Sequence, residues 1–170
     1  MECTRAVGLN DETAERIRAL GLKPHPEGGF YRCTFTSDLS LTYGNPAGQD
    51  RSIATAILYL LPAGDVSRIH RIDSDEMWHF YHGQPLTIVE LKTGSVHTET
   101  ILGRNSGQVC QNLVPRGVWF GAFSSTASYS LVGCTVFPGY DFDNFEIGSR
   151  DFLRIQFPES EAIIEKLGAQ

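Results

Sequence analysis

The sequence has no excess of positive charge and no apolar run long enough to cross a membrane. Its 14 Lys and Arg residues are outnumbered by 20 Asp and Glu residues, so the net charge is −6. The longest apolar stretch, Ile53 to Leu61, has the length of a strand rather than the roughly 20 residues of a membrane span. The start of the chain also lacks the apolar segment of a secretory signal. We therefore expect a cytoplasmic protein that partners neither nucleic acid nor membrane.

Cysteine is scarce, and its spacing excludes the common zinc motifs. The four cysteines are Cys3, Cys33, Cys110 and Cys134, and no two of them form a Cys-x-x-Cys pair. A chain of 170 residues buries about 70% of its unfolded surface, so it does not need disulfides for stability. We expect reduced and mostly buried thiols.

Low-complexity tracts, charge blocks and repeats are also missing. With 41% hydrophobic and 20% charged residues, the composition is that of an ordinary globular protein rather than a disordered one. At about 150 residues per domain, the length favours a single domain over residues 1–170, with its core at about 30–137.

What the sequence does contain is a series of short strand patterns between two helical ends. One helix is expected from Asn10 or Asp11 to Leu20, and two more over Asp151–Phe157 and Ser160–Leu167, separated by Pro158. The strands are rich in Val, Ile, Thr and aromatic residues, with Gly, Pro, Asn or Asp in most gaps. They are expected at Phe30–Thr36, Ile53–Leu61, Val66–Ile72, Glu76–Tyr81, Leu86–Leu91, Val96–Leu102, Val109–Val114, Val118–Phe123 and Tyr129–Phe137. This pattern predicts an all-β barrel or jelly roll.

Two segments without a strand pattern border this barrel. In residues 24–29, two prolines fix an extended backbone and two glycines permit a sharp bend, which makes a place at the pocket rim plausible for His25 and Glu27. Residues 140–146 follow the last strand. They either cover the mouth of the barrel or leave Asp141, Asp143 and Glu146 in solvent.

Strand alternation groups several polar side chains on one face. If His70 points inward, Arg68 does so too, and an inward Glu76 brings Trp78 to the same face. An imidazole, a guanidinium and a carboxylate would then meet an aromatic wall, which is the usual make-up of a small-molecule pocket.

These residues also lie in a pattern that resembles the cupin superfamily. Gly64, His70, Glu76 and Gly83 match the first cupin motif, and Gly107, Pro115 and Gly117 match the second with two extra residues. The runs at 24–31, 76–83 and 114–119 are similar to a small single-cupin family of unknown function. The resemblance implies a double-stranded β-helix, and commonly a homodimer. An outward face bearing Met77, His79 and Tyr81 favours the same dimer.

The chain departs from the family pattern at two metal-ligand positions, which hold Ile72 and Phe120. Only His70 and Glu76 remain, whereas a catalytic metal site normally has three or more protein ligands. His79 is an odd number of positions from Glu76, so strand alternation points it out of the barrel. His82 or His97 would complete a metal site only if it reached the same pocket. We therefore expect no standard cupin metal centre and no cofactor.

The roles of the candidate residues leave alternatives. His70 is either a core imidazole bonded to Glu76 or a ligand contact that, with Glu76, performs acid–base chemistry. Arg68 needs either Glu76 or an anionic ligand as its partner. Trp78 and Phe120 are either core residues or a stacking wall for the ligand.

Three functions compete on this basis. The favoured hypothesis is a protein that binds a small anionic or sugar-like molecule, with Arg68, His70, Glu76, Trp78, Phe120, His25 and Glu27 as binding residues. The second is a metal-free isomerase or epimerase acting on a sugar or sugar nucleotide. The resemblance implies His70 as its base, with Tyr31, Tyr129 and Tyr140 as candidate acids. The third is a structural, storage-like protein with an empty pocket.

Overall fold

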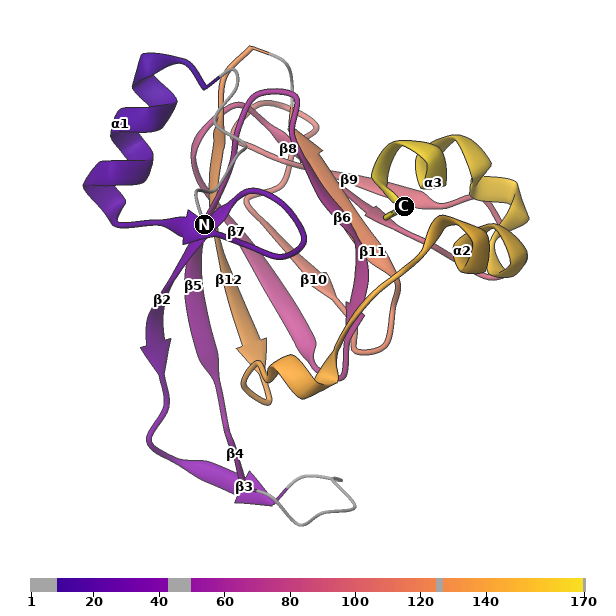
Figure 1. Ribbon diagram of the computed structural model, residues 1–170, viewed down its shortest axis with the longest axis horizontal. Helices are drawn as coiled ribbons and strands as arrows, with labels where there is room; N and C mark the ends of the chain where they lie inside the picture. The colour runs from indigo at the N-terminus through magenta and orange to yellow at the C-terminus, as the bar shows by residue number, and fades with distance from the viewer. Residues whose placement is uncertain (1–8, 43–49, 125–126, 170) are drawn as a thin grey trace, which may run out of the picture.

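The computed structural model describes residues 9–42, 50–124 and 127–169, and these form two antiparallel sheets that face each other (Figure 1). In spatial order, one sheet contains β1 (Lys23–Pro24), β2 (Phe30–Thr36), β5 (Thr55–Leu61), β12 (Ser130–Phe137), β7 (Asp75–Gly83) and β10 (Gln111–Val114). The other contains β13 (Phe145–Ile147), β6 (Val66–Ile72), β11 (Phe120–Ser124), β8 (Leu86–Glu90) and β9 (Thr98–Leu102). The predicted all-β architecture is confirmed, and β2 and β6 have the predicted bounds.

The two sheets enclose the main core. Alternation along the strands sends one set of side chains inward, where burial of apolar surface stabilises the sandwich. The buried inner residues are Tyr59, Leu61, Trp78, Leu86, Ile88, Leu102, Val114, Phe120, Ala122, Val132 and Cys134. A short hairpin of β3 (Ser40–Thr42) and β4 (Asp50–Ser52) extends beyond one end of the barrel (Figure 1).

The first helix, α1 (Asp11–Leu20), covers part of the outer face of the six-stranded sheet. It begins at Asn10, whose side-chain oxygen accepts a hydrogen bond of 2.8 Å from the backbone N–H of Thr13. It ends at Gly21, which adopts the left-handed conformation (φ 62°) that terminates many helices. Ile17 and Leu20 pack on an outer cluster that includes Leu60. The predicted start and end of this helix are confirmed.

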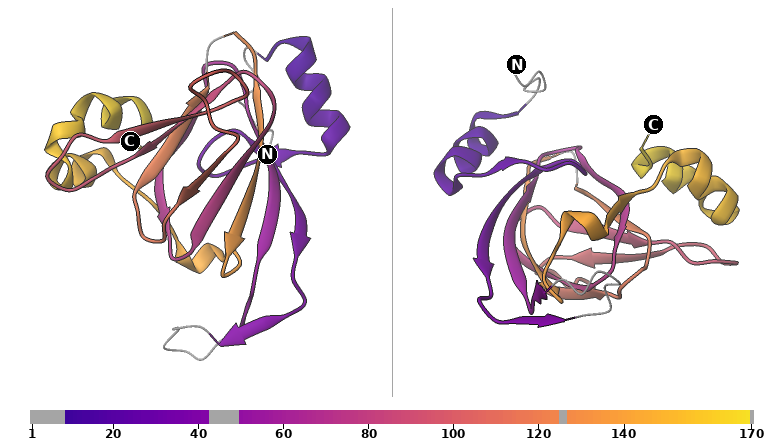
Figure 2. Two further views of the ribbon diagram at one scale, coloured as in Figure 1. Left: turned by 180° about the vertical axis from the view of Figure 1, so that it is seen from behind. Right: turned by 60° about the horizontal axis from the view of Figure 1, so that its bottom comes forward.

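The carboxyl-terminal helices α2 (Arg150–Gln156) and α3 (Glu161–Leu167) cover the outer face of the five-stranded sheet (Figure 2). A 3₁₀ turn, η2 (Pro158–Ser160), separates them, as the proline predicts. Leu153 and Ile164 are completely buried against Ile69 and its neighbours on this sheet. Ile69 therefore points away from the space between the sheets.

A β-bulge in β6 changes which of its side chains face inward. Against β11, Phe120 pairs with His70 and Ala122 pairs with Ser67, so the single residue Gly121 lies opposite two residues of β6. A Cβ atom at Gly121 would lie only 2.8 Å from the carbonyl oxygen of Ser67, so glycine permits this close approach. As a result Ser67 and His70 both face inward although they are three positions apart.

Cysteine burial differs from the prediction. Cys134 is buried, but Cys33 and Cys110 are exposed, so the expectation of mostly buried thiols is wrong for both. Cys33 lies on β2, where only the two-residue β1 covers one edge, and Cys110 directly precedes the edge strand β10. Cys3 lies outside the described residues. No helix in the described part of the chain is long and apolar enough to span a membrane.

Candidate functional site

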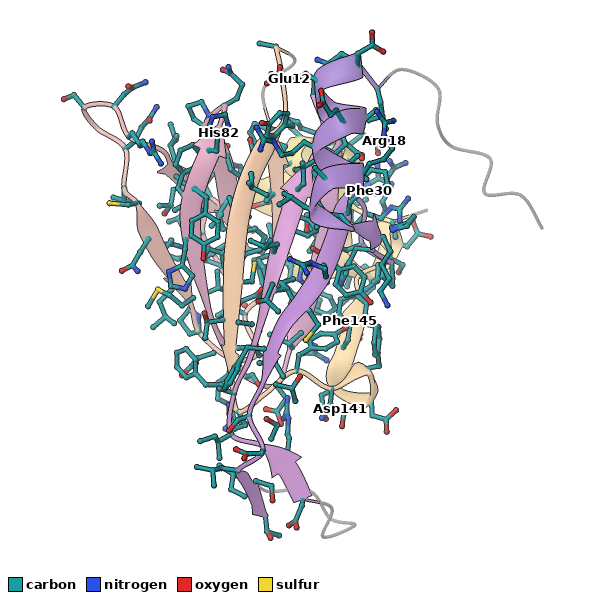
Figure 3. The ribbon with its side chains drawn as sticks, turned by 90° about the vertical axis from the view of Figure 1, so that its left-hand side faces the viewer. Glu12, Arg18, Phe30, His82, Asp141 and Phe145 are labelled. Carbon is teal, nitrogen blue, oxygen red and sulfur yellow. The ribbon has the colours of Figure 1, made fainter. Side chains whose placement is uncertain are left out.

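A cavity of about 550 Å³ opens at one end of the barrel. Its apolar wall comes from β5, β6 and β12, including Ile57, Ile72 and Val136. Residues 140–142 line the cavity from the segment that leads into the 3₁₀ turn η1 (Phe142–Asn144), and the ribbon of this segment crosses the end of the barrel (Figure 2). The cavity-lining Asp141 lies at the end of the barrel away from Glu12 and His82 (Figure 3).

The loop between β1 and β2 carries Glu27 into this cavity and holds it against β6. Gly28 has a φ of 120°, and a Cβ atom there would lie 2.1 Å from the carbonyl oxygen of Val66. Only glycine therefore lets the loop approach β6 this closely. The backbone N–H of Arg68 donates to the carbonyl oxygen of Glu27 (2.9 Å), and the hydroxyl of Tyr59 donates to that of Gly28 (2.9 Å). Glu27 is only 5% exposed.

The Glu27 carboxyl group has two side-chain partners on β6, both placed there by the bulge. The hydroxyl of Ser67 donates to Oε1 (2.8 Å), and Nε2 of His70 lies 3.1 Å from Oε2. Nδ1 of His70 lies 2.7 Å from the carbonyl oxygen of Arg68, which can only accept, so Nδ1 carries a proton. A second proton must lie between Nε2 and Glu27. Whichever atom holds it, the Glu27–His70 pair has no net charge.

His25 contacts the same carboxyl group as a neutral imidazole. Its Nδ1 accepts the backbone N–H of Glu27 (3.4 Å) and lies 3.6 Å from Oε2. Burial lowers the pKa of His25, the Glu27 charge opposes this effect, and the nearby His70 lowers the pKa further. The ring is held edge-on by Tyr31, with 4.6 Å between centroids.

Glu76 enters the cavity from β7 and is in a different protonation state. It is 7% exposed, and no cation pairs with its carboxyl group in the described structure. Burial, followed by the charge of Glu27, raises the pKa of Glu76 to about 8. At neutral pH this side chain is therefore mainly a carboxylic acid that can donate a proton or a hydrogen bond.

Tyr140 contributes a second donor near the mouth. Its hydroxyl is buried without a hydrogen-bond partner among the described residues, and its ring packs at 5.1 Å from Phe142 and 6.0 Å from Phe145. Burial and the charges of Glu27 and Glu76 raise the pKa of Tyr140, so the hydroxyl stays protonated at physiological pH. Tyr31 also lines the cavity, whereas the hydroxyl of Tyr129 bonds to Arg16 (3.2 Å) and lies 3.2 Å from His82 Nδ1, outside the cavity.

The structure brings together only part of the predicted set. His25, Glu27, His70 and Glu76 line one cavity. Arg68 does not, and the expectation that it faces inward beside His70 is wrong. The bulge breaks the alternation, and the Arg68 guanidinium instead donates to the carbonyl oxygen of Pro26 (3.1 Å).

Trp78 and Phe120 are buried beside the cavity in the main core rather than in its lining. The centroid of the Phe120 ring lies 4.2 Å from that of His70, so the two rings pack against each other. Sequence reasoning missed Ser67, Tyr59 and Cys134. A strict strand period of two would place Ser67 on the opposite face from His70, so the sequence pattern does not predict it at the site. Its presence there follows from the long-range contact between Glu27 and β6.

The residues present do not fit the metal centre of metal-binding cupins. Among the described residues, no three or more His, Cys, Asp or Glu side chains are placed to hold a metal ion. His79 bonds to Thr135 and Gln111 on the outer face of the barrel, and neither His82 nor His97 lines the cavity. In place of metal ligation, the cluster offers a proton-sharing pair and a protonated acid.

Known proteins share this fold over almost the whole chain. Protein SO0799 from Shewanella oneidensis is 37% identical, with a TM-score of 0.82 over 96% of this chain and 99% of its own. A hypothetical protein from Leishmania major is 31% identical, with a TM-score of 0.83 over 92% and 98%. A cupin-2 domain protein from Rhodospirillum rubrum shares the fold at 10% identity, with a TM-score of 0.59 over 99% and 96%.

The curated proteins searched contain no match to this chain. A family model described as "Cupin superfamily (DUF985)" matches residues 14–148, which include every strand of the two sheets. The jelly-roll prediction and the family resemblance are both confirmed. The chain belongs to the cupin superfamily, in the family of unknown function DUF985.

Proposed function

We propose that this protein binds a small polar molecule, sugar-like or anionic, in the cavity that contains Glu27, His70 and Glu76. The observation that supports this proposal most is the buried polar cluster itself. Four titratable side chains, His25, Glu27, His70 and Glu76, converge in a cavity whose other walls are largely apolar. Buried polar groups are costly, and small-ligand sites typically combine apolar walls with a few such convergent groups. A storage-like role gives no reason for this cluster.

The proposal is tested by ligand screening with matched variants. Thermal-shift measurements with sugars, nucleotide sugars and small carboxylates should identify a molecule that stabilises the wild type, and native mass spectrometry should show one bound per chain. Glu27→Gln should abolish the stabilisation, because it disturbs the carboxyl group at the centre of the site. Glu159→Gln, at an exposed position on η2, should retain it. The absence of any ligand, or binding that Glu27→Gln leaves intact, would contradict the proposal.

A second candidate function is proton-transfer catalysis of the isomerase or epimerase type. It is favoured by the presence of an acid and a base in one cavity: Glu76 holds a proton, and the Glu27–His70 pair can exchange one. In such a reaction the pair would accept the proton of a substrate C–H bond, while Glu76 would donate a proton to the developing oxyanion. Delivery of a solvent-derived proton to the opposite face of the same carbon, with the enol proton returning to Glu76 and the abstracted proton passing from the pair to solvent, would complete an epimerisation.

Solvent deuterium exchange distinguishes catalysis from binding alone. A substrate of this reaction should gain deuterium at one carbon in D₂O with the wild-type protein, as detected by NMR or mass spectrometry. The exchange should be lost in Glu76→Gln if this residue supplies the acid. A ligand that binds tightly but shows no exchange would leave the protein as a binding protein.

We also propose that the chain forms a homodimer through the outer face of the six-stranded sheet. Helix α1 covers only part of this face, and Phe35, Tyr81, Leu113 and Phe137 expose apolar surface on the rest. Exposed apolar surface of this kind is typical of a protein–protein interface. Light scattering should give twice the monomer mass at micromolar concentration, and a monomer mass would contradict the proposal.

The cytoplasm is the compartment that we propose for this protein. Cys33, Cys110 and Cys134 are free, and two of them are exposed, which suits a reducing environment. Alkylation in intact cells should label Cys33 and Cys110 as free thiols, whereas their recovery as disulfides would contradict this location.

A further inference from the structure

We infer that the part of the ligand that enters the cavity is uncharged and presents an oxygen atom to the hydroxyl of Tyr140, as a neutral sugar or cyclic polyol does. This inference rests on the proposed binding function and deepens it. It selects the sugar-like alternative over the anionic one, and it makes Tyr140 a binding residue.

The interior of the cavity carries no net charge. Glu27 and His70 share one proton and together have no net charge, since Nδ1 of His70 already donates to the Arg68 carbonyl oxygen. His25 accepts a backbone N–H through Nδ1, which requires the neutral imidazole. Glu76 has no cationic partner in the described structure and is stable there as the neutral acid. The buried polar groups therefore carry no excess charge for a ligand to balance.

The cations near the cavity lie outside its interior. The sequence predicts that Arg68 faces into the barrel. Its guanidinium instead donates a hydrogen bond to the Pro26 carbonyl oxygen and does not line the cavity. Lys23 and Arg32 are the cations among the described lining residues, and both are exposed. A buried carboxylate or phosphate without a paired cation would lose its hydration free energy without compensation. An anionic group can contact these two cations only if it remains outside, at the mouth.

The hydroxyl of Tyr140 is a free hydrogen-bond donor in the cavity wall among the described residues. Tyr140 lines the cavity, yet its hydroxyl is buried and has no hydrogen-bond partner in the part of the chain that the structure describes. Buried donors are nearly always satisfied, so an orphaned one in a cavity wall indicates an acceptor that arrives with a ligand. A hydroxyl, ring or carbonyl oxygen of a neutral sugar would be such an acceptor. The protonated Glu76 offers a second donor from another wall, and the apolar side chains of Ile57 and Ile72 suit the C–H face of a sugar ring.

Matched pairs of neutral and charged probes test this assignment. Calorimetry or saturation-transfer NMR would compare glucose with glucuronate, galactose with galacturonate, and inositol with inositol monophosphate. The neutral member of at least one pair should bind about tenfold or more tightly than its charged partner. Tighter binding of a charged member that Glu27→Gln abolishes would overturn the inference and leave the proposed function intact. If no member of any pair binds, the inference and the proposed function are both overturned.

Tyr140→Phe tests the role of the hydroxyl directly. Removing an unpartnered buried hydroxyl should leave the melting temperature of the free protein unchanged or slightly higher. Affinity for the neutral probe should fall by about tenfold, the effect of losing one hydrogen bond. Tyr81→Phe, on the outer face of β7, is the control and should not alter that affinity. Unchanged affinity in Tyr140→Phe, or a marked loss of stability without ligand, would overturn the role of Tyr140.

Discussion

The two glutamates of the cavity are buried to a similar extent, yet they have different hydrogen-bond partners. Glu27 lies on a loop clamped to β6, with a hydroxyl and an imidazole as partners. Glu76 lies on β7 without a cationic partner among the residues that the structure describes, and burial raises its pKa to about 8. Partners as well as burial therefore determine how a buried carboxyl group behaves.

Removing the Glu27 side chain should have the largest effect on stability. Glu27→Ala leaves His70 buried beside an empty space and the hydroxyl of Ser67 without its acceptor. We expect the free energy of unfolding to fall by about 3–5 kcal/mol, the usual cost of breaking a buried charged pair. Urea denaturation would measure it, with Glu159→Ala on the surface as the control. A loss as small as that of the control would show that the Glu27 contacts do not stabilise the fold.

Glu76 should make the protein less stable as the pH rises. Its pKa is about 8 in the folded state and near 4.5 when exposed, so the folded state binds more protons between these values and stability falls across this range. From pH 6 to pH 9 the loss should be about 2–3 kcal/mol. Glu76→Gln should remove this part of the pH dependence. An equally steep dependence in the variant would assign it to another group.

Ser67→Ala should have a smaller effect, because it removes one hydrogen bond to the Glu27 carboxyl group and leaves His70 in place. A hydrogen bond of this kind contributes about 1–3 kcal/mol. Chemical denaturation would measure the loss, and Ser40→Ala on the exposed β3 provides the control. If Ser67→Ala lowers the free energy of unfolding no more than Ser40→Ala does, the bulge does not serve to position Ser67.

Arg68→Ala should have the smallest effect. Its guanidinium makes a partly exposed bond to the Pro26 carbonyl oxygen, so its loss should cost less than about 1 kcal/mol of stability. Ligand affinity should be unchanged, because Arg68 is outside the cavity. Titration of the wild type and variant with the same ligand checks this, and a large loss of affinity would restore the sequence-based role for Arg68.

The fold was largely predictable because local patterns determine it. The Asn10 cap, the Gly21 terminator and the Pro158 break have simple stereochemical causes, and the β2 and β6 patterns gave the correct strand bounds. Long-range events were not predictable. The bulge opposite Gly121 depends on pairing between β6 and β11, and it reversed the orientation expected for Arg68.

The site could be predicted only in part for the same reason. The cupin motif identified His70 and Glu76, and the proline- and glycine-rich loop pointed to His25 and Glu27. The direct bond between Glu27 and Ser67, however, spans 40 residues of sequence. The orphaned hydroxyl of Tyr140 is likewise a property of packing, which one sequence does not reveal.

The protonation state of Glu76 tests the central claim most directly, because the account requires a neutral acid opposite the Glu27–His70 pair. Carboxyl-¹³C NMR of glutamate-labelled protein would follow each side chain from pH 5 to pH 10, with Glu76→Gln assigning the signal of Glu76. This signal should be that of a protonated carboxyl group at pH 6 and should titrate near pH 8. A Glu76 signal that is fully ionised at pH 6 would contradict it.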